Sequence, residues 1–89
     1  MPLSPQERFA ANLRRARTAA GISQEELGNR CDLHRTEISL LERAGREPRL
    51  GTIVKLAGAL GTTPGDLCAG ISWVPADHRY AVKPPPRDG

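Results

Sequence analysis

The chain has 89 residues, of which 13 are Lys or Arg and 10 are Asp or Glu, giving a net charge of +3. This length predicts one domain with a small core. No apolar run approaches the ~18–20 residues of a membrane span, and the first residues lack the basic and apolar regions of a signal peptide. We therefore expect a cytoplasmic protein that does not bind membranes.

Aromatic residues are scarce in this chain, and two of the three, Trp73 and Tyr80, lie near its end. The preceding residues must pack through Leu, Ile, Val and Ala, which favours helices over a β-sandwich. Cys31 and Cys68 lack a second Cys or His at metal-ligand spacing. We interpret them as buried core residues, with a disulfide as the alternative, and expect neither a metal nor another cofactor.

The first two predicted helices have clear start signals. A helix over residues 5–20 begins after Ser4, which can cap it, and ends at Gly21. Its apolar residues recur at spacings of three and four. A second helix, over residues 24–31, begins at Ser23, which with Glu26 forms a predicted capping box.

Three further helices are predicted, over residues 35–43, 50–60 and about 63–68. His34 precedes the third helix and is a poorer cap than Ser or Thr. A loop at 44–48 precedes the fourth helix, and Gly61 ends it.

Residues 71–89 differ in character from the rest of the chain. The apolar residues of 71–82 are spaced as in an extended strand, and the prolines at 84–86 exclude helix, so we expect a disordered Pro-rich end. The predicted fold is therefore an all-α domain of five helices over residues 4–70, followed by an extended C-terminal segment over 71–89.

The second and third helices are short, joined by a tight turn and flanked by longer helices, which is the layout of a helix-turn-helix. The stretches 21–28 (GISQEELG) and 38–43 (ISLLER), followed by residues 50–61, resemble the XRE family of lambda-repressor-like and Cro-like regulators. The resemblance runs without gaps from about Phe9 to Cys68. It implies a compact lambda-repressor-like domain that binds double-stranded DNA with the helix 35–43 in the major groove.

The resemblance also assigns roles to individual residues. It places Gln24 at a phosphate, and it places Arg43 and Arg46 as phosphate-binding residues. His34 stands where a cap is usual, and its imidazole is an alternative phosphate contact. The resemblance implies a structural ion pair between Arg17 and Glu42. On the groove-facing side of the recognition helix it places Arg35, Thr36, Ser39 and Leu40.

The leading functional hypothesis is a sequence-specific transcriptional regulator, a repressor, that binds operator half-sites as a homodimer. The fifth helix and residues 71–82 form the expected dimer surface, with contacts from Trp73, Val74, Tyr80 and Val82. The alternative is an antitoxin-like interaction module whose C-terminal tail binds a protein partner. An enzyme is the third hypothesis, which the lack of a catalytic motif disfavours.

Overall fold

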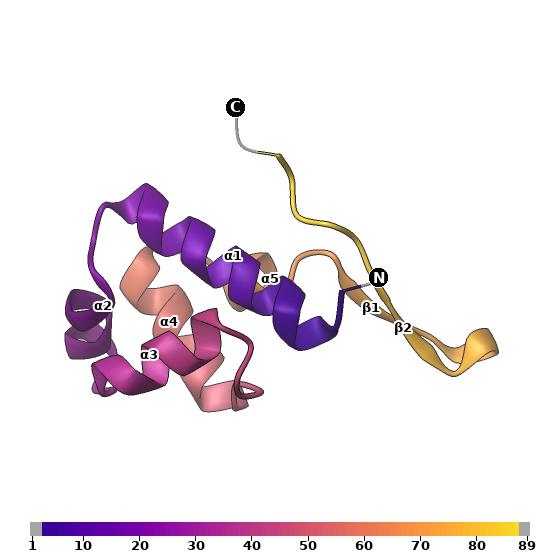
Figure 1. Cartoon of the computed structure of the whole chain (residues 1–89), viewed down its shortest axis with the longest axis horizontal. Coiled ribbons are helices and arrows are strands. Elements are labelled where there is room, and N and C mark those ends of the chain that lie inside the picture. The colour runs from indigo at the N-terminus through magenta and orange to yellow at the C-terminus, as the bar shows by residue number, and fades with distance from the viewer. Residues whose placement is uncertain (1–2, 88–89) are drawn as a thin grey trace.

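Five helices precede a β-hairpin in the computed structural model, which describes residues 3–87 (Figure 1). The elements are α1 (Pro5–Ala20), α2 (Gln24–Cys31), α3 (Arg35–Glu42), α4 (Leu50–Leu60), α5 (Pro64–Leu67), β1 (Ile71–Val74), a 3₁₀ turn (Pro75–Asp77) and β2 (Arg79–Val82). The predicted all-α domain is confirmed. No helix within residues 3–87 is long and apolar enough to cross a membrane.

The two predicted N-terminal caps are present, but one differs in detail. At α1 the Ser4 hydroxyl accepts from the Glu7 amide (3.1 Å), and the Glu7 carboxylate accepts from the Ser4 amide (2.9 Å). At α2 the Ser23 hydroxyl accepts from the Glu26 amide at 3.0 Å. The reciprocal bond predicted for Glu26 is wrong, because its carboxylate pairs with Arg30 one turn later, at 3.2 Å.

The core lies where α1, α2, α3 and α4 meet over α5, and it is built from aliphatic residues with one aromatic. Its members are Phe9, Leu13, Leu27, Cys31, Ile38, Leu41, Leu56, Ala57 and Leu67. Cys31 is buried as predicted, whereas Cys68 is only half-buried, and both are free thiols, so the disulfide alternative is wrong. Burial raises the pKa of both thiols, which keeps them protonated at neutral pH.

Residues 71–82 form a hairpin rather than a single extended strand. β1 and β2 pair antiparallel, with Trp73 opposite Tyr80. The chain reverses at Pro75–Asp77, and His78 takes a left-handed conformation (φ 49°). Proline and aspartate favour such turns, a signal that the apolar spacing of the segment obscured. The hairpin projects from the helical part at the right of Figure 1.

A buried arginine attaches the hairpin to α1. Arg8 is only 5% exposed. Its Nε donates to Asn12 Oδ1 at 2.9 Å, and its Nη1 donates to the Lys83 carbonyl. Asn12 in turn donates to the carbonyls of Leu67 (2.9 Å), the last residue of α5, and Ala69 (3.0 Å), which follows that helix. One turn of α1 therefore holds both the end of α5 and the exit of the hairpin.

This attachment predicts a specific effect of Gly70→Ala. Gly70 has a φ of 84°, and a Cβ there would lie 2.4 Å from Arg8 Nη1. A matched control is Gly61→Ala, since Gly61 has a φ of 67° and no atom within 4 Å of its Cβ position. Both variants carry the left-handed penalty of about 1–2 kcal/mol, but only Gly70→Ala displaces Arg8. We expect it to lower the melting temperature further, and equal losses would contradict the anchor.

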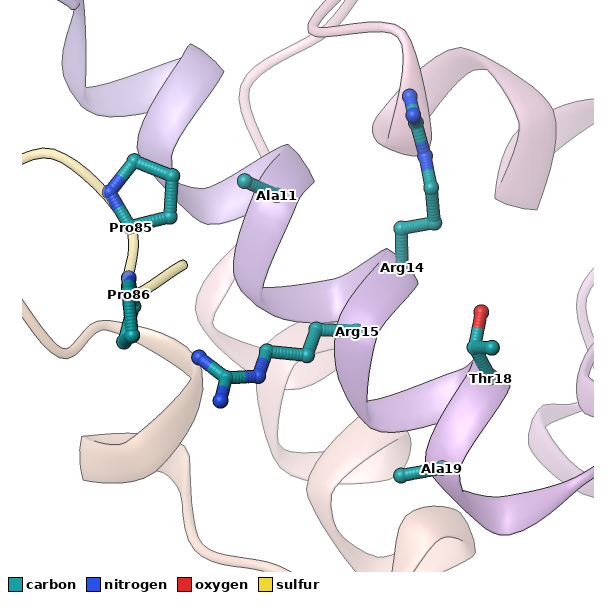
Figure 2. Close-up of a pocket in the computed structure, with 7 residues that line it drawn as sticks. All are labelled: Ala11, Arg14, Arg15, Thr18, Ala19, Pro85 and Pro86. Atoms are coloured by element: carbon teal, nitrogen blue, oxygen red, sulfur yellow. The ribbon is translucent and has the colours of Figure 1, made fainter. Parts of the chain in front are cut away.

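The segment after β2 runs without helix or strand along the outer face of α1. Pro85 lies beside Ala11, and Arg15 extends toward Pro86 (Figure 2). A groove of about 440 Å³ lies between this segment and the helix. The Pro-rich end that we predicted to be disordered also includes Asp88 and Gly89, which lie outside the described residues.

Candidate nucleic-acid interface

The turn between α2 and α3 is held tight by a glycine. The amides of Asp32 and Leu33 both donate to the Gly28 carbonyl, and Asp32 takes a left-handed conformation (φ 56°). A Cβ on Gly28 would lie 2.5 Å from the Leu33 carbonyl oxygen. Leu27 and Ile38 are fully buried beneath the turn. Together these contacts fix the crossing of the two helices.

His34 caps the recognition helix α3. Its Nδ1 accepts from the Thr36 amide at 3.1 Å and lies 2.9 Å from the Thr36 hydroxyl. A nitrogen that accepts an N–H is unprotonated, so the ring proton is on Nε2, which leaves that edge a donor. His34 therefore caps α3 with a side-chain acceptor, and the expectation that it is a poorer cap than Ser or Thr stays a prediction.

Removing this cap is expected to destabilise the domain modestly. His34→Ala should cost about 1 kcal/mol, the usual value for a lost N-cap, while His34→Ser should retain most of the stability. Chemical denaturation followed by circular dichroism measures both variants. A Ser variant that is as unstable as the Ala variant would show that the imidazole acts through packing rather than through its hydrogen bond.

The outer side of α3 presents the residues expected to read DNA. Arg35 and Thr36 are exposed and Ser39 is half-buried. Arg35 makes no side-chain hydrogen bond to any residue between 3 and 87. Leu40 is half-buried, and its carbonyl accepts from the Gly45 amide at 2.8 Å. Its Cδ2 lies 3.2 Å from the Cβ position of Gly45, so Leu40 also packs against the loop after α3.

Glu42 joins three helices at the base of α3. Its Oε2 accepts from Arg17 Nε at 2.6 Å, and its Oε1 accepts from Arg17 Nη2 at 3.0 Å. The Glu42 carboxylate is 3% exposed, and hydrogen bonding to it raises the pKa of Arg17. The pair implied by the family resemblance is therefore present. Gln24 also donates to Oε1 (3.2 Å), so its amide lies against α3 in the free protein.

The basic residues after α3 differ in how they are held. Arg43 is the C-cap of α3 rather than its last residue, and its exposed side chain donates to the Ser39 carbonyl at 3.3 Å. Arg46 pairs with Glu37, an exposed contact of the kind worth only ~0–1 kcal/mol. A phosphate can replace that carboxylate at little cost.

Two contacts of the site, made by Arg14 and Glu37, were not predicted from the sequence. Arg14 Nη2 donates to the Glu42 carbonyl at 3.0 Å. Glu37 pairs with Arg46 after the helix. No cluster of three or more His, Cys, Asp or Glu that could hold a metal occurs within the described part of the chain.

Comparison with known proteins also identifies a helix-turn-helix in this chain. A helix-turn-helix family model matches residues 13–67. The control protein C.BamHI of Bacillus amyloliquefaciens is 45% identical over 60 residues, covering 66% of this chain and 74% of that protein. The restriction-modification controller C.AhdI of Aeromonas hydrophila superposes with a TM-score of 0.68 at 40% identity, over 70% of this chain and 94% of its own.

A repressor bound to DNA has the same fold. The P22 c2 repressor, in complex with a synthetic operator, superposes with a TM-score of 0.66 at 29% identity, over 70% of this chain and 94% of its own. The family match covers more than half of the chain and includes both helices of the motif. The chain belongs to the helix-turn-helix family, as a DNA-binding transcription regulator of the XRE type.

Proposed function

We propose that this regulator is a repressor that binds operator half-sites as a homodimer, with α3 in the major groove. The observation that carries the proposal is the outer face of α3, with Arg35 exposed and Ser39 half-buried, which the Glu42 contacts and the His34 cap hold in place. A preorganised face reads bases without the entropic cost of ordering it on binding. The similarity to the P22 c2 repressor supports the repressor role.

Each residue on this surface has a proposed contact. Arg35 donates to O6 and N7 of a guanine through its two-pronged guanidinium. Ser39 reaches a base edge, and Leu40 contacts a thymine methyl with the part of its side chain that the loop leaves open. The remaining residues bind phosphates or position those that do, and they are Gln24, His34 through Nε2, Thr36, Arg43 and Arg46.

Selection of bound sequences from a random DNA library tests this assignment. Arg35→Ala is expected to relax preference at one base position by about 1–3 kcal/mol. Arg43→Ala, an exposed Arg at the other end of the same helix, should weaken all sequences alike and flatten the salt dependence. A uniform loss in both variants would contradict the division between base-reading and phosphate-binding residues.

The homodimer is supported by the apolar face of the hairpin. Side chains alternate across strands, so Trp73, Tyr80 and Val82 share one face and Val74 lies on the other. Trp73 is 51% and Tyr80 54% exposed, an unusual position for large aromatic residues. Sedimentation equilibrium at micromolar concentration, with and without operator DNA, tests the dimer, and a monomer under both conditions would refute it.

The antitoxin-like alternative is based on the same aromatic pair, which lies outside the matched residues 13–67. A stoichiometric protein partner that is lost on truncation after Gly70 would favour it. We also propose that the protein lies in the cytoplasm and has no catalytic role. The relatives are named as control proteins and a repressor, which supports both proposals.

A further inference from the structure

We propose that the two subunits of the dimer exchange their C-terminal tails, so that residues 84–87 of a second copy occupy the cleft beside Tyr80. This inference rests on the proposed homodimer and names the segment that covers the aromatic face of the hairpin. Three features carry it: the chemistry of the cleft, the conformation that the prolines impose, and the position of the tail on its own subunit.

The cleft lies between the start of α1, the loop before α4 and the hairpin, and it has a volume of about 180 Å³. Its apolar lining residues include Phe9, Pro48, Ile53, Ile71 and Tyr80. Trp73 contacts one of these lining residues, since its ring meets that of Tyr80 edge-on with centroids 5.2 Å apart. Grooves lined by aromatic rings are the sites that bind polyproline II segments.

The tail has the conformation that such a groove selects. Three consecutive prolines, Pro84 to Pro86, fix φ near −65° and hold the preceding residues extended. A preformed polyproline II segment loses little conformational entropy on binding. The next residue is Arg87, and the cleft is lined at one side by Glu47, so the charges of segment and cleft are complementary.

The tail does not occupy the cleft of its own subunit. It lies against Ala11 (Figure 2), whereas the cleft lies against Phe9, and two helical residues turn the chain by 200°, to the opposite face of α1. Its start is fixed, because the Lys83 amide donates to the Gly70 carbonyl at 2.8 Å and its carbonyl accepts from Arg8. Consecutive prolines do not reverse direction, so the segment leads away from Tyr80.

The prolines of the tail bury little surface on their own α1. Pro84 and Pro86 are exposed and only Pro85 is half-buried, over the groove that separates the segment from the helix. Few apolar contacts are therefore lost when the segment moves to a second copy. In that copy it would bury the two largest exposed aromatic side chains of the described chain.

Trp73 is the only tryptophan, so its fluorescence reports on this cleft directly. Three samples are compared: the full chain, a chain ending at Lys83, and that shorter chain with a peptide of residues 83–89 added. We expect the emission of the full chain to shift with protein concentration as dimers form. We expect the shorter chain to dimerise at least tenfold more weakly, and the peptide to restore the shift. A peptide with the three prolines replaced by Ala is the matched control and should not restore it.

Two further measurements separate the possible failures. Arg87→Glu should weaken the dimer and Glu47→Lys should restore it in the same chain. If the shorter chain dimerises as tightly as the full chain, tail exchange is refuted while the homodimer stands. If the full chain is monomeric by sedimentation, the homodimer is refuted and the exchange with it, even where the peptide still shifts Trp73.

Discussion

Replacing Glu42 with Ala is expected to lower the free energy of unfolding by about 3–5 kcal/mol, the usual cost of removing one partner of a buried ion pair. The carboxylate accepts from both Arg17 and Gln24, and it is 3% exposed. Its loss leaves the Arg17 guanidinium with the Ile22 carbonyl as its one hydrogen-bond partner among residues 3–87. Since small domains have ~5–15 kcal/mol of stability, the variant should be partly unfolded at 37 °C.

Urea denaturation measures this effect, with Glu26→Ala as the control. Glu26 also pairs with an arginine, Arg30, but both side chains are about half exposed, so its loss should cost under about 1 kcal/mol. Similar losses in the two variants would show that burial does not strengthen the Glu42 pair. The double variant Arg17→Met, Glu42→Leu should recover much of the stability, because it removes the unpaired charge together with its partner.

Gly28→Val is expected to prevent the helix-turn-helix from closing. Even a single Cβ at this position would lie 2.5 Å from the Leu33 carbonyl oxygen and 3.4 Å from the Arg35 amide nitrogen. A branched side chain cannot move away from backbone atoms on both sides, so α2 and α3 must separate and expose Leu27 and Ile38. We expect a loss above about 3 kcal/mol, in the range of severe core disruptions, and with it the loss of DNA binding.

Gly58→Val is the matched control for this prediction. Gly58 is also helical, but no atom lies within 4 Å of its Cβ position, so Val should be tolerated there. Circular dichroism and operator binding compare the two variants. If Gly28→Val folds and binds DNA as the control does, the close approach of the turn does not limit the structure.

The features that could be predicted from sequence are those that depend on local contacts. Ser4, Ser23 and Gly21 mark helix ends because they act on backbone groups within four residues of themselves. The pairing of Arg17 with Glu42 came from the family resemblance. The role of Arg8 depends on the Lys83 carbonyl, 75 residues away, and no local pattern shows such a contact.

In the site, too, some features could be predicted from the sequence and others depend on contacts that no local pattern shows. The family resemblance placed Arg35 and Ser39 on the outer side of α3, where Arg35 is exposed and Ser39 is half-buried. The packing of Leu40 against the loop depends on Gly45. Gly45 lies close to Leu40 because Ala44, which follows the helix, takes a left-handed conformation (φ 56°). The cap by His34 depends on the tautomer of its ring and on the position of Thr36. Both effects require the three-dimensional arrangement of the turn or loop.

The two ends of α3 also set how freely the operator preference of this protein can be changed. Thr36 is tied to the His34 cap and Leu40 to the loop at Gly45, so a substitution at either position changes helix stability along with the proposed DNA contact. Arg35 and Ser39 make no such side-chain bonds within residues 3–87. Libraries aimed at new DNA targets should therefore vary positions 35 and 39 first, and vary 36 and 40 only together with their structural partners.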